Sequence, residues 1–147
     1  MKFTAALLLA PLAAAAPTII NPAHNGTAPD PSTYENVNIS GLSLRESINA
    51  TTTKVLGIER VDFYINGNVS CSAVAPGTQG KVFGCDGTPY SFGLVNGTTS
   101  QFGLRLYKQT SPFAGWTGSG DVATYCRSGG GAVEICEQVT PSTIVIS

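Results

Sequence analysis

The 147-residue chain predicts one all-β domain, a compact antiparallel β-barrel or sandwich of short strands with two intrachain disulfides. Apolar residues alternate with others over Val61–Ile65, Tyr90–Leu94 and Phe102–Leu106, and a period of two places one face of each segment in a core. Pairs typical of tight hairpin turns connect such segments, namely Asn66-Gly67, Asp86-Gly87 and Asn96-Gly97. No segment after the first 16 residues shows the apolar spacing of an amphipathic helix.

The first 15 residues have the features of a secretory signal peptide. Lys2 precedes an apolar run over residues 5–16, and the small residues Ala13 and Ala15 fit cleavage after Ala15. The run is shorter than the about 20 residues that a membrane-spanning helix requires, so no membrane span is expected. The sequence therefore predicts a secreted, extracellular protein.

Residues 16–33 are predicted to form a disordered arm because they contain four prolines among Asn, Gly and Thr. The domain is expected over residues 34–147. Its first element, Tyr34–Ser47, is interpreted as one bulged strand or two strand pieces, since Gly41 interrupts the apolar pattern. A polar loop over 49–53 and a short strand over Val55–Ile58 are expected before the central strands.

The pattern becomes less regular after Lys108. Residues 109–121 contain Pro112, three glycines and the single tryptophan, Trp116, and are predicted to be the longest loop of the domain. Three closing strands are expected over Val122–Cys126, Ala132–Val139 and Thr143–Ile146.

Four cysteines in a secreted chain predict two disulfides with three possible connectivities. The spacing favours local pairing, of Cys71 with Cys85 and of Cys126 with Cys136. Each bridge is expected to add about 2–4 kcal/mol to stability by restricting the unfolded chain. A zinc site is not expected, because no Cys-x-x-Cys pair occurs and the only histidine is His24; no cofactor is predicted.

Composition argues against several functions. Charged residues make up 12% of the chain and form no basic cluster, so nucleic-acid binding is not expected. His24 lies in the predicted arm, where nothing would position it as a catalytic base, so the chain is not expected to be an enzyme.

A glycoside hydrolase with paired carboxylates is the alternative, and it requires two acids about 5–10 Å apart. Two acids facing each other across a groove would support it. None of the acids in the domain has a distinctive local setting; they are Glu35, Glu46, Glu59, Asp62, Asp86, Asp121, Glu134 and Glu137.

Two surface features complete the candidate sites. Five Asn-x-Ser/Thr motifs are candidate N-glycosylation sites, at Asn25, Asn38, Asn49, Asn68 and Asn96. Tyr64 and Tyr107 fall on the polar phase of their strands and, with Trp116, could form a contact patch. The alternative is that a closed barrel or sandwich buries part of both phases.

The segment Tyr125–Gly130 (YCRSGG), followed by Cys136, resembles the major allergen family of Alternaria, the Alt a 1 type. Val69–Ala73 and Val82–Cys85 are similar to the two strands of that family that share its first disulfide. Phe102–Gln109 is similar to the strand that follows, and the resemblance covers most of the domain from Tyr34 onward.

The resemblance implies a compact antiparallel β-barrel with Cys71–Cys85 and Cys126–Cys136 bridged. It also implies a secreted fungal protein that acts as an effector or elicitor, binds a plant defence protein of the thaumatin-like class, or is an allergen. No enzymatic activity is general to that family. Its allergen has a further N-terminal cysteine that joins two subunits; this chain lacks one, so a covalent dimer is not expected.

The hypothesis at this point is an effector that binds a host extracellular protein. The residues expected to contact the partner are Arg105, Tyr107, Trp116 and Arg127. A small-ligand carrier that uses the barrel interior is a further alternative. Large inward side chains are expected to fill that interior instead, namely Phe63, Phe92, Phe102 and Leu104.

Overall fold

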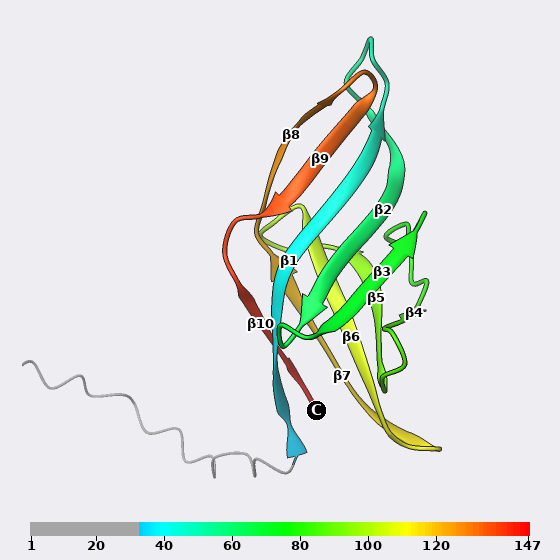
Figure 1. The fold of residues 1–147 in the computed structure, drawn as a ribbon, viewed down its shortest axis with the longest axis vertical. Coiled ribbons are helices and arrows are strands. Elements are labelled where there is room, and N and C mark those ends of the chain that lie inside the picture. The colour runs from blue at the N-terminus through cyan, green and yellow to red at the C-terminus, as the bar shows by residue number, and fades with distance from the viewer. Residues whose placement is uncertain (1–32) are drawn as a thin grey trace, which may run out of the picture.

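The computed structural model describes residues 33–147, which form ten strands and no α-helix (Figure 1). The predicted signal peptide, all but the last residue of the predicted arm, His24 and Asn25 lie outside the described residues. The strands are β1 (Glu35–Ile48), β2 (Val55–Ile65), β3 (Val69–Val74), β4 (Phe83–Gly84), β5 (Tyr90–Asn96), β6 (Phe102–Ser111), β7 (Ala114–Val122), β8 (Thr124–Gly130), β9 (Val133–Gln138) and β10 (Ser142–Ile146). Over residues 33–147, no helix is long and apolar enough to cross a membrane.

The strands form two antiparallel sheets. Sheet A has the order β3-β2-β1-β9-β8, with β10 also paired to β1, and sheet B has the order β4-β5-β6-β7. At one edge, a β-bridge between Cys71 of β3 and Cys85 after β4 joins sheet A to sheet B. At the opposite edge, Thr117 of β7 exchanges two hydrogen bonds of 3.2 Å with Ser147, which follows β10. The sheets thus form a sandwich with linked edges and not one closed barrel, and the predicted all-β antiparallel class is confirmed.

The inner faces of the two sheets build one core. Phe63 of sheet A meets Phe92 of sheet B edge to face, with ring centroids 4.8 Å apart. Phe102 and Leu104 are also buried, so the four large side chains expected to fill the interior do so. This burial removes apolar surface from water and supplies the main driving force for folding.

Strand β1 is a single bulged strand. Gly41 has a φ of +65°, and the register to β2 shifts between Ser40 and Ser43. The extra residue changes the phase of the strand, so Ile39 before the bulge and Leu44 after it both point into the core. The short strand predicted before the central segment is continuous with it, as β2.

Both disulfides have the predicted pairing, Cys71 with Cys85 and Cys126 with Cys136. The second joins directly opposite residues of β8 and β9.

The prediction of a long loop over residues 109–121 is wrong. Strand β6 continues to Ser111 and β7 begins at Ala114, so only two residues turn the chain. Strand β10 packs so closely across β7 that a Cβ atom at Gly118 would lie 1.9 Å from the carbonyl oxygen of Val145. The glycines that suggested a loop are therefore needed inside a strand. Trp116 accordingly lies in β7.

Candidate functional site

The hairpin of β6 and β7 extends past the rest of sheet B. The ladder of β5 and β6 ends at Tyr90 opposite Lys108, and Gln109 still donates a backbone hydrogen bond of 2.9 Å to the carbonyl of Pro89, so β6 extends past β5 with β7 as its paired strand (Figure 1). The turn carries Pro112 and Phe113, and the Phe113 side chain is fully exposed. A shallow groove of about 410 Å³ surrounds this tip and includes Tyr107 and Trp116. A large apolar side chain held in water at the end of a hairpin is a candidate contact for a partner.

Arg105 and Tyr107 lie on the outward face of sheet B. Their neighbours in β6, Leu104 and Leu106, are buried, so the alternation turns Arg105 and Tyr107 away from the core. The Arg105 guanidinium donates a hydrogen bond of 3.2 Å to the hydroxyl of Ser119, its register partner in β7. The structure therefore places two of the predicted contact residues side by side on one face.

Trp116 lies on the other side of the same hairpin. It is half-buried, packs against the core and is the register partner of Lys108. The Lys108 ammonium lies 5.2 Å from the ring centroid of Tyr90 and 5.8 Å from that of Trp116, and forms an ion pair with Glu35. Tyr90 donates a hydrogen bond to the same Glu35 carboxylate. These contacts tie the start of β1 to sheet B, which is a structural role for Trp116.

The same contacts set the charge state of Glu35. Burial acts to raise the pKa of its carboxyl group, but the hydrogen bonds from Lys108 and Tyr90 and the charge of Lys108 outweigh burial. The net effect is a pKa below the usual value, so Glu35 is ionised and the cluster holds a charge pair at neutral pH.

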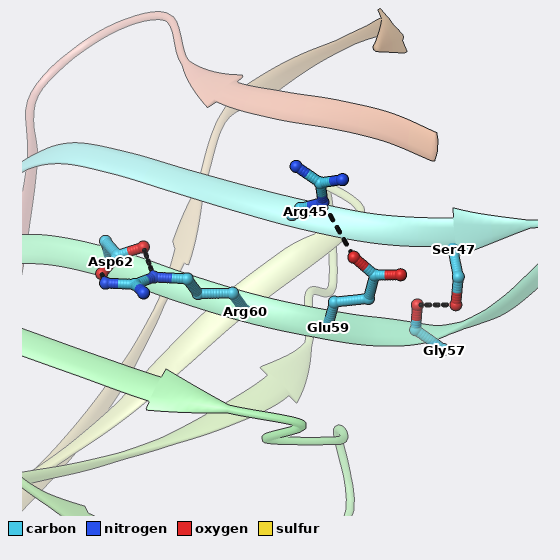
Figure 2. A network of polar contacts seen from close by, with 6 residues as sticks. All are labelled: Arg45, Ser47, Gly57, Glu59, Arg60 and Asp62. Atoms are coloured by element: carbon cyan, nitrogen blue, oxygen red, sulfur yellow. Dashed lines mark hydrogen bonds and ion pairs between the residues drawn. The ribbon is translucent and has the colours of Figure 1, made fainter. Parts of the chain in front are cut away.

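Arg127 is separated from the other predicted contact residues. It lies on β8 in sheet A and forms an ion pair of 3.1 Å with Glu137 of β9. The outer face of β1 and β2 likewise carries compensated charges: Arg45 pairs with Glu59, and Arg60 with Asp62 (Figure 2). Such exposed pairs contribute little to stability, and they leave no strongly charged patch on this face.

A second candidate site lies on the inner face of sheet A. Glu46 of β1 is 1% exposed and stands opposite Glu134 of β9 and Ile58 of β2. The Glu46 carboxyl lies within 4.8 Å of both Cys126 and Cys136, but those sulfurs are bonded to each other and are not the thiolates that a metal needs. This cluster is therefore not a metal centre in the oxidised protein.

The sequence did not single out Phe113, and it offered Glu46 only as one of the candidate acids, without predicting its burial. Phe113 was hidden because Pro112 was interpreted as part of a long loop, whereas Pro-Phe after a strand pattern also fits a two-residue hairpin turn. Glu46 had a usable signal: the bulge at Gly41 turns Leu42 and Leu44 inward, and the same phase reaches Glu46.

The described candidate glycosylation sites are all exposed, at Asn38, Asn49, Asn68 and Asn96. Asn68 lies in the turn between β2 and β3, and Asn96 ends β5 just before the turn to β6. That second turn is rigid, because Asp121 accepts hydrogen bonds from the backbone and hydroxyl groups of Thr98 and Thr99.

The fold belongs to a class of small, disulfide-bonded antiparallel β proteins that includes solved fungal allergens. Two crystal structures of Alternaria alternata allergen Alt a 1 superpose with TM-scores of 0.59 and 0.58 at 20% and 22% sequence identity. Each superposition covers 76% of this chain, and 87% and 92% of the respective allergen chain. At this identity the superposition establishes the fold alone.

The sequence comparisons identify the family. Residues 39–136 match the family model described as Alternaria alternata allergen 1. The effector protein PevD1 of Verticillium dahliae is 36% identical over 153 residues, which cover 99% of this chain and 94% of PevD1. The chain therefore belongs to the Alternaria alternata allergen 1 family, and the resemblance noted in the sequence is confirmed.

Proposed function

We propose that the chain is a secreted fungal effector that acts by binding an extracellular protein of a plant host, a thaumatin-like defence protein being the expected class. The observation that carries this proposal is the 36% identity to an effector protein over nearly the whole of both chains. The two disulfides agree with an extracellular destination, because such bonds persist in oxidising compartments.

The proposed contact is the hairpin surface, defined as Arg105, Tyr107 and Phe113. Arg and aromatic side chains contribute most often to the energetic centres of protein interfaces. Phe113 offers an apolar anchor with no desolvation penalty for a charge, and Arg105 has only a neutral hydroxyl as its side-chain hydrogen-bond partner among the described contacts. Arg127 is less suited, because it lies on β8 of sheet A, away from Phe113, and Glu137 already balances its charge.

A pull-down from plant extracellular fluid tests the proposal, with the folded and oxidised protein as bait and mass spectrometry to identify what is captured. The Phe113→Ser variant is expected to lose most of the captured protein, and Arg105→Ala with Tyr107→Ala to weaken capture further. Tyr125→Ala is the matched control, because Tyr125 is 66% exposed but lies on β8, away from the hairpin surface.

Specific capture that survives all hairpin substitutions but fails with Tyr125→Ala would reject the hairpin surface and keep the effector function. A failure to capture any extracellular host protein, with oxidised and reduced bait behaving alike, would count against the function itself.

The hydrolase alternative has one observation in its favour. Glu46 and Glu134 are neighbouring acids, and the pKa of Glu46 is raised by burial and by the charge of Glu134. Both acids, however, come from adjacent strands of one sheet, whereas glycoside hydrolysis requires groups on the two sides of the scissile bond. The pair is therefore better suited to holding a charge than to cleaving a sugar.

A further inference from the structure

Sheet A extends beyond sheet B at the end that carries the β1–β2 turn, which we call the distal end (Figure 1). A groove of about 300 Å³ lies there, between β2 and the turn from β5 to β6. It is lined by residues of both sheets: Glu46, Val55, Leu56, Gly57, Ile58, Gly77, Thr78, Asn96, Gln101 and Phe102. No lysine or arginine is among these described lining residues, so nothing in the wall of the groove balances the charge of an acid.

Glu46 is the buried acid of this groove. Its side chain is 1% exposed, and the Gln101 side chain hydrogen-bonds its carboxyl group. The other close polar neighbour is the Sγ atom of Cys136, 3.7 Å from Oε2, and a disulfide sulfur has no proton to donate. The described contacts of this carboxyl group therefore include one neutral donor, carried by the exposed residue Gln101.

Glu134 adds a second negative charge directly opposite Glu46 on β9. Like charges in opposite positions of neighbouring strands destabilise a sheet. Four ion pairs occur over residues 33–147, and they neutralise Glu35, Glu59, Asp62 and Glu137 but neither Glu46 nor Glu134. A cation in the groove would relieve both the burial of Glu46 and its repulsion from Glu134.

The rest of the lining indicates the kind of cation. Leu56, Ile58 and Phe102 provide apolar walls, which favour an organic body over a hydrated metal ion. Calcium takes six to eight oxygen ligands, more than the Glu46 carboxylate and the side-chain amide oxygens of Asn96 and Gln101 provide in the groove wall. An ammonium group has three donors, and the acceptors in the groove wall are the Glu46 carboxylate and the side-chain amide oxygens of Asn96 and Gln101.

We infer that the distal groove binds an organic cation, a primary ammonium group on an apolar body, with Glu46 in the groove wall as its counter-charge and Glu134, opposite Glu46 on β9, as a second negative charge nearby. The free amine of a small molecule and the lysine side chain of a partner protein present this same group. The inference does not depend on the proposed effector function, because it uses a different end of the molecule from the hairpin surface.

The experiment is an NMR titration of the oxidised, ¹⁵N-labelled protein with benzylammonium chloride, at constant ionic strength. Saturable shifts are expected at the amides of Glu46, Ile58 and Gln101, with an affinity in the millimolar range that is normal for a ligand of this size. Loss of one charge-assisted hydrogen bond lowers affinity by about tenfold, so Glu46→Gln is expected to weaken binding to that extent. Glu134→Gln is expected to weaken it less, because Glu134 is more exposed.

Glu137→Gln is the matched control, since Glu137 lies on the same strand but faces outward against Arg127. Benzyl alcohol, which has the same ring but no charge, is expected not to bind. In a second titration, lysine acetylated at its α-nitrogen and converted to the methylamide replaces benzylammonium, so that its side-chain ammonium group is free. Tighter binding of this probe identifies a protein lysine as the source of the ammonium group, and weaker binding identifies a small amine.

Three results would overturn the inference. Benzyl alcohol could bind as well as the ammonium, which would make the groove merely apolar. Glu46→Gln and Glu137→Gln could bind equally well, which would remove Glu46 from the site. Calcium chloride could instead produce the saturable shifts at the same amides while benzylammonium produced none. Glu46→Gln keeps its shape and removes a buried charge, so a well-dispersed spectrum of this variant is expected and makes the comparison valid.

Discussion

Gly118→Ala tests how closely β10 packs across β7. The added Cβ atom would lie 1.9 Å from the carbonyl oxygen of Val145, whereas ordinary contact begins at 3.4 Å, so β10 must move by about 1.5 Å. That movement breaks the two hydrogen bonds between Thr117 and Ser147, each of which contributes about 1 kcal/mol. It also exposes part of Ile144 and Ile146, which are now 1% and 0% exposed, at a further cost of about 1–3 kcal/mol.

The expected loss is therefore about 3–5 kcal/mol in the free energy of unfolding, a large part of the stability of a domain this size. Urea unfolding followed by the fluorescence of Trp116, the single tryptophan, measures it. Gly84→Ala is the matched control, because its added Cβ atom would meet nothing within 4 Å and its backbone is not left-handed. A Gly118→Ala protein as stable as Gly84→Ala would refute the close packing that makes the glycines of β7 necessary.

Three further predictions concern stability and modification. Because the pKa of Glu46 is raised above its ordinary value of 4.5, the folded state holds a proton that the unfolded state has released, and stability falls as pH rises through that window. Glu46→Gln should therefore gain stability relative to wild type between pH 4 and pH 8 in urea titrations, and a pH-independent difference would contradict the burial of this acid. Replacing Cys126 and Cys136 together by serine should cost about 2–4 kcal/mol in the same assay, and no loss would mean that the hairpin is held by packing alone. Protein secreted by a fungal host should carry glycans at Asn68 or Asn96, shown by a mass shift after enzymatic deglycosylation; an unchanged mass would reject both sites.

Much of the fold followed from local patterns in the sequence. Over Phe102–Leu106 and Val61–Ile65 a period of two decides which face is buried, and that decision needs no knowledge of the partner strand. The local disulfide pairing followed because each pair of cysteines flanks one excursion of the chain. The bulge at Gly41 was also predictable, since glycine in a strand pattern signals a change of phase.

The features of the fold that the sequence did not predict depend on contacts between distant parts of the chain. Gly118 and Gly120 read as loop residues, because the strand that requires their small size, β10, lies more than 20 residues further on. Lys108 lies over the rings of both Trp116 and Tyr90, and neither contact is visible without the register of β5, β6 and β7. Tertiary context thus overrode local propensity over residues 109–121. The closing strand expected over Val122–Cys126 is also wrong as one element, since Val122 ends β7 and Thr124 begins β8.

The candidate surface was predictable only in part. The outward positions of Arg105 and Tyr107 followed from the alternation of β6, but Arg127 was grouped with them although it lies on the other sheet. Phe113 became recognisable as a contact only when the chain between β6 and β7 proved to be a two-residue turn.

Photo-crosslinking from the hairpin tip tests most directly whether this protein works by binding a host protein there. A benzophenone amino acid replaces Phe113 in one sample and Tyr125 in a control sample, and each is irradiated in plant extracellular fluid. Binding through the hairpin surface predicts one dominant crosslinked host protein from position 113 and none of it from position 125. The same protein crosslinked from position 125 and not from position 113 would contradict the assignment of the hairpin surface.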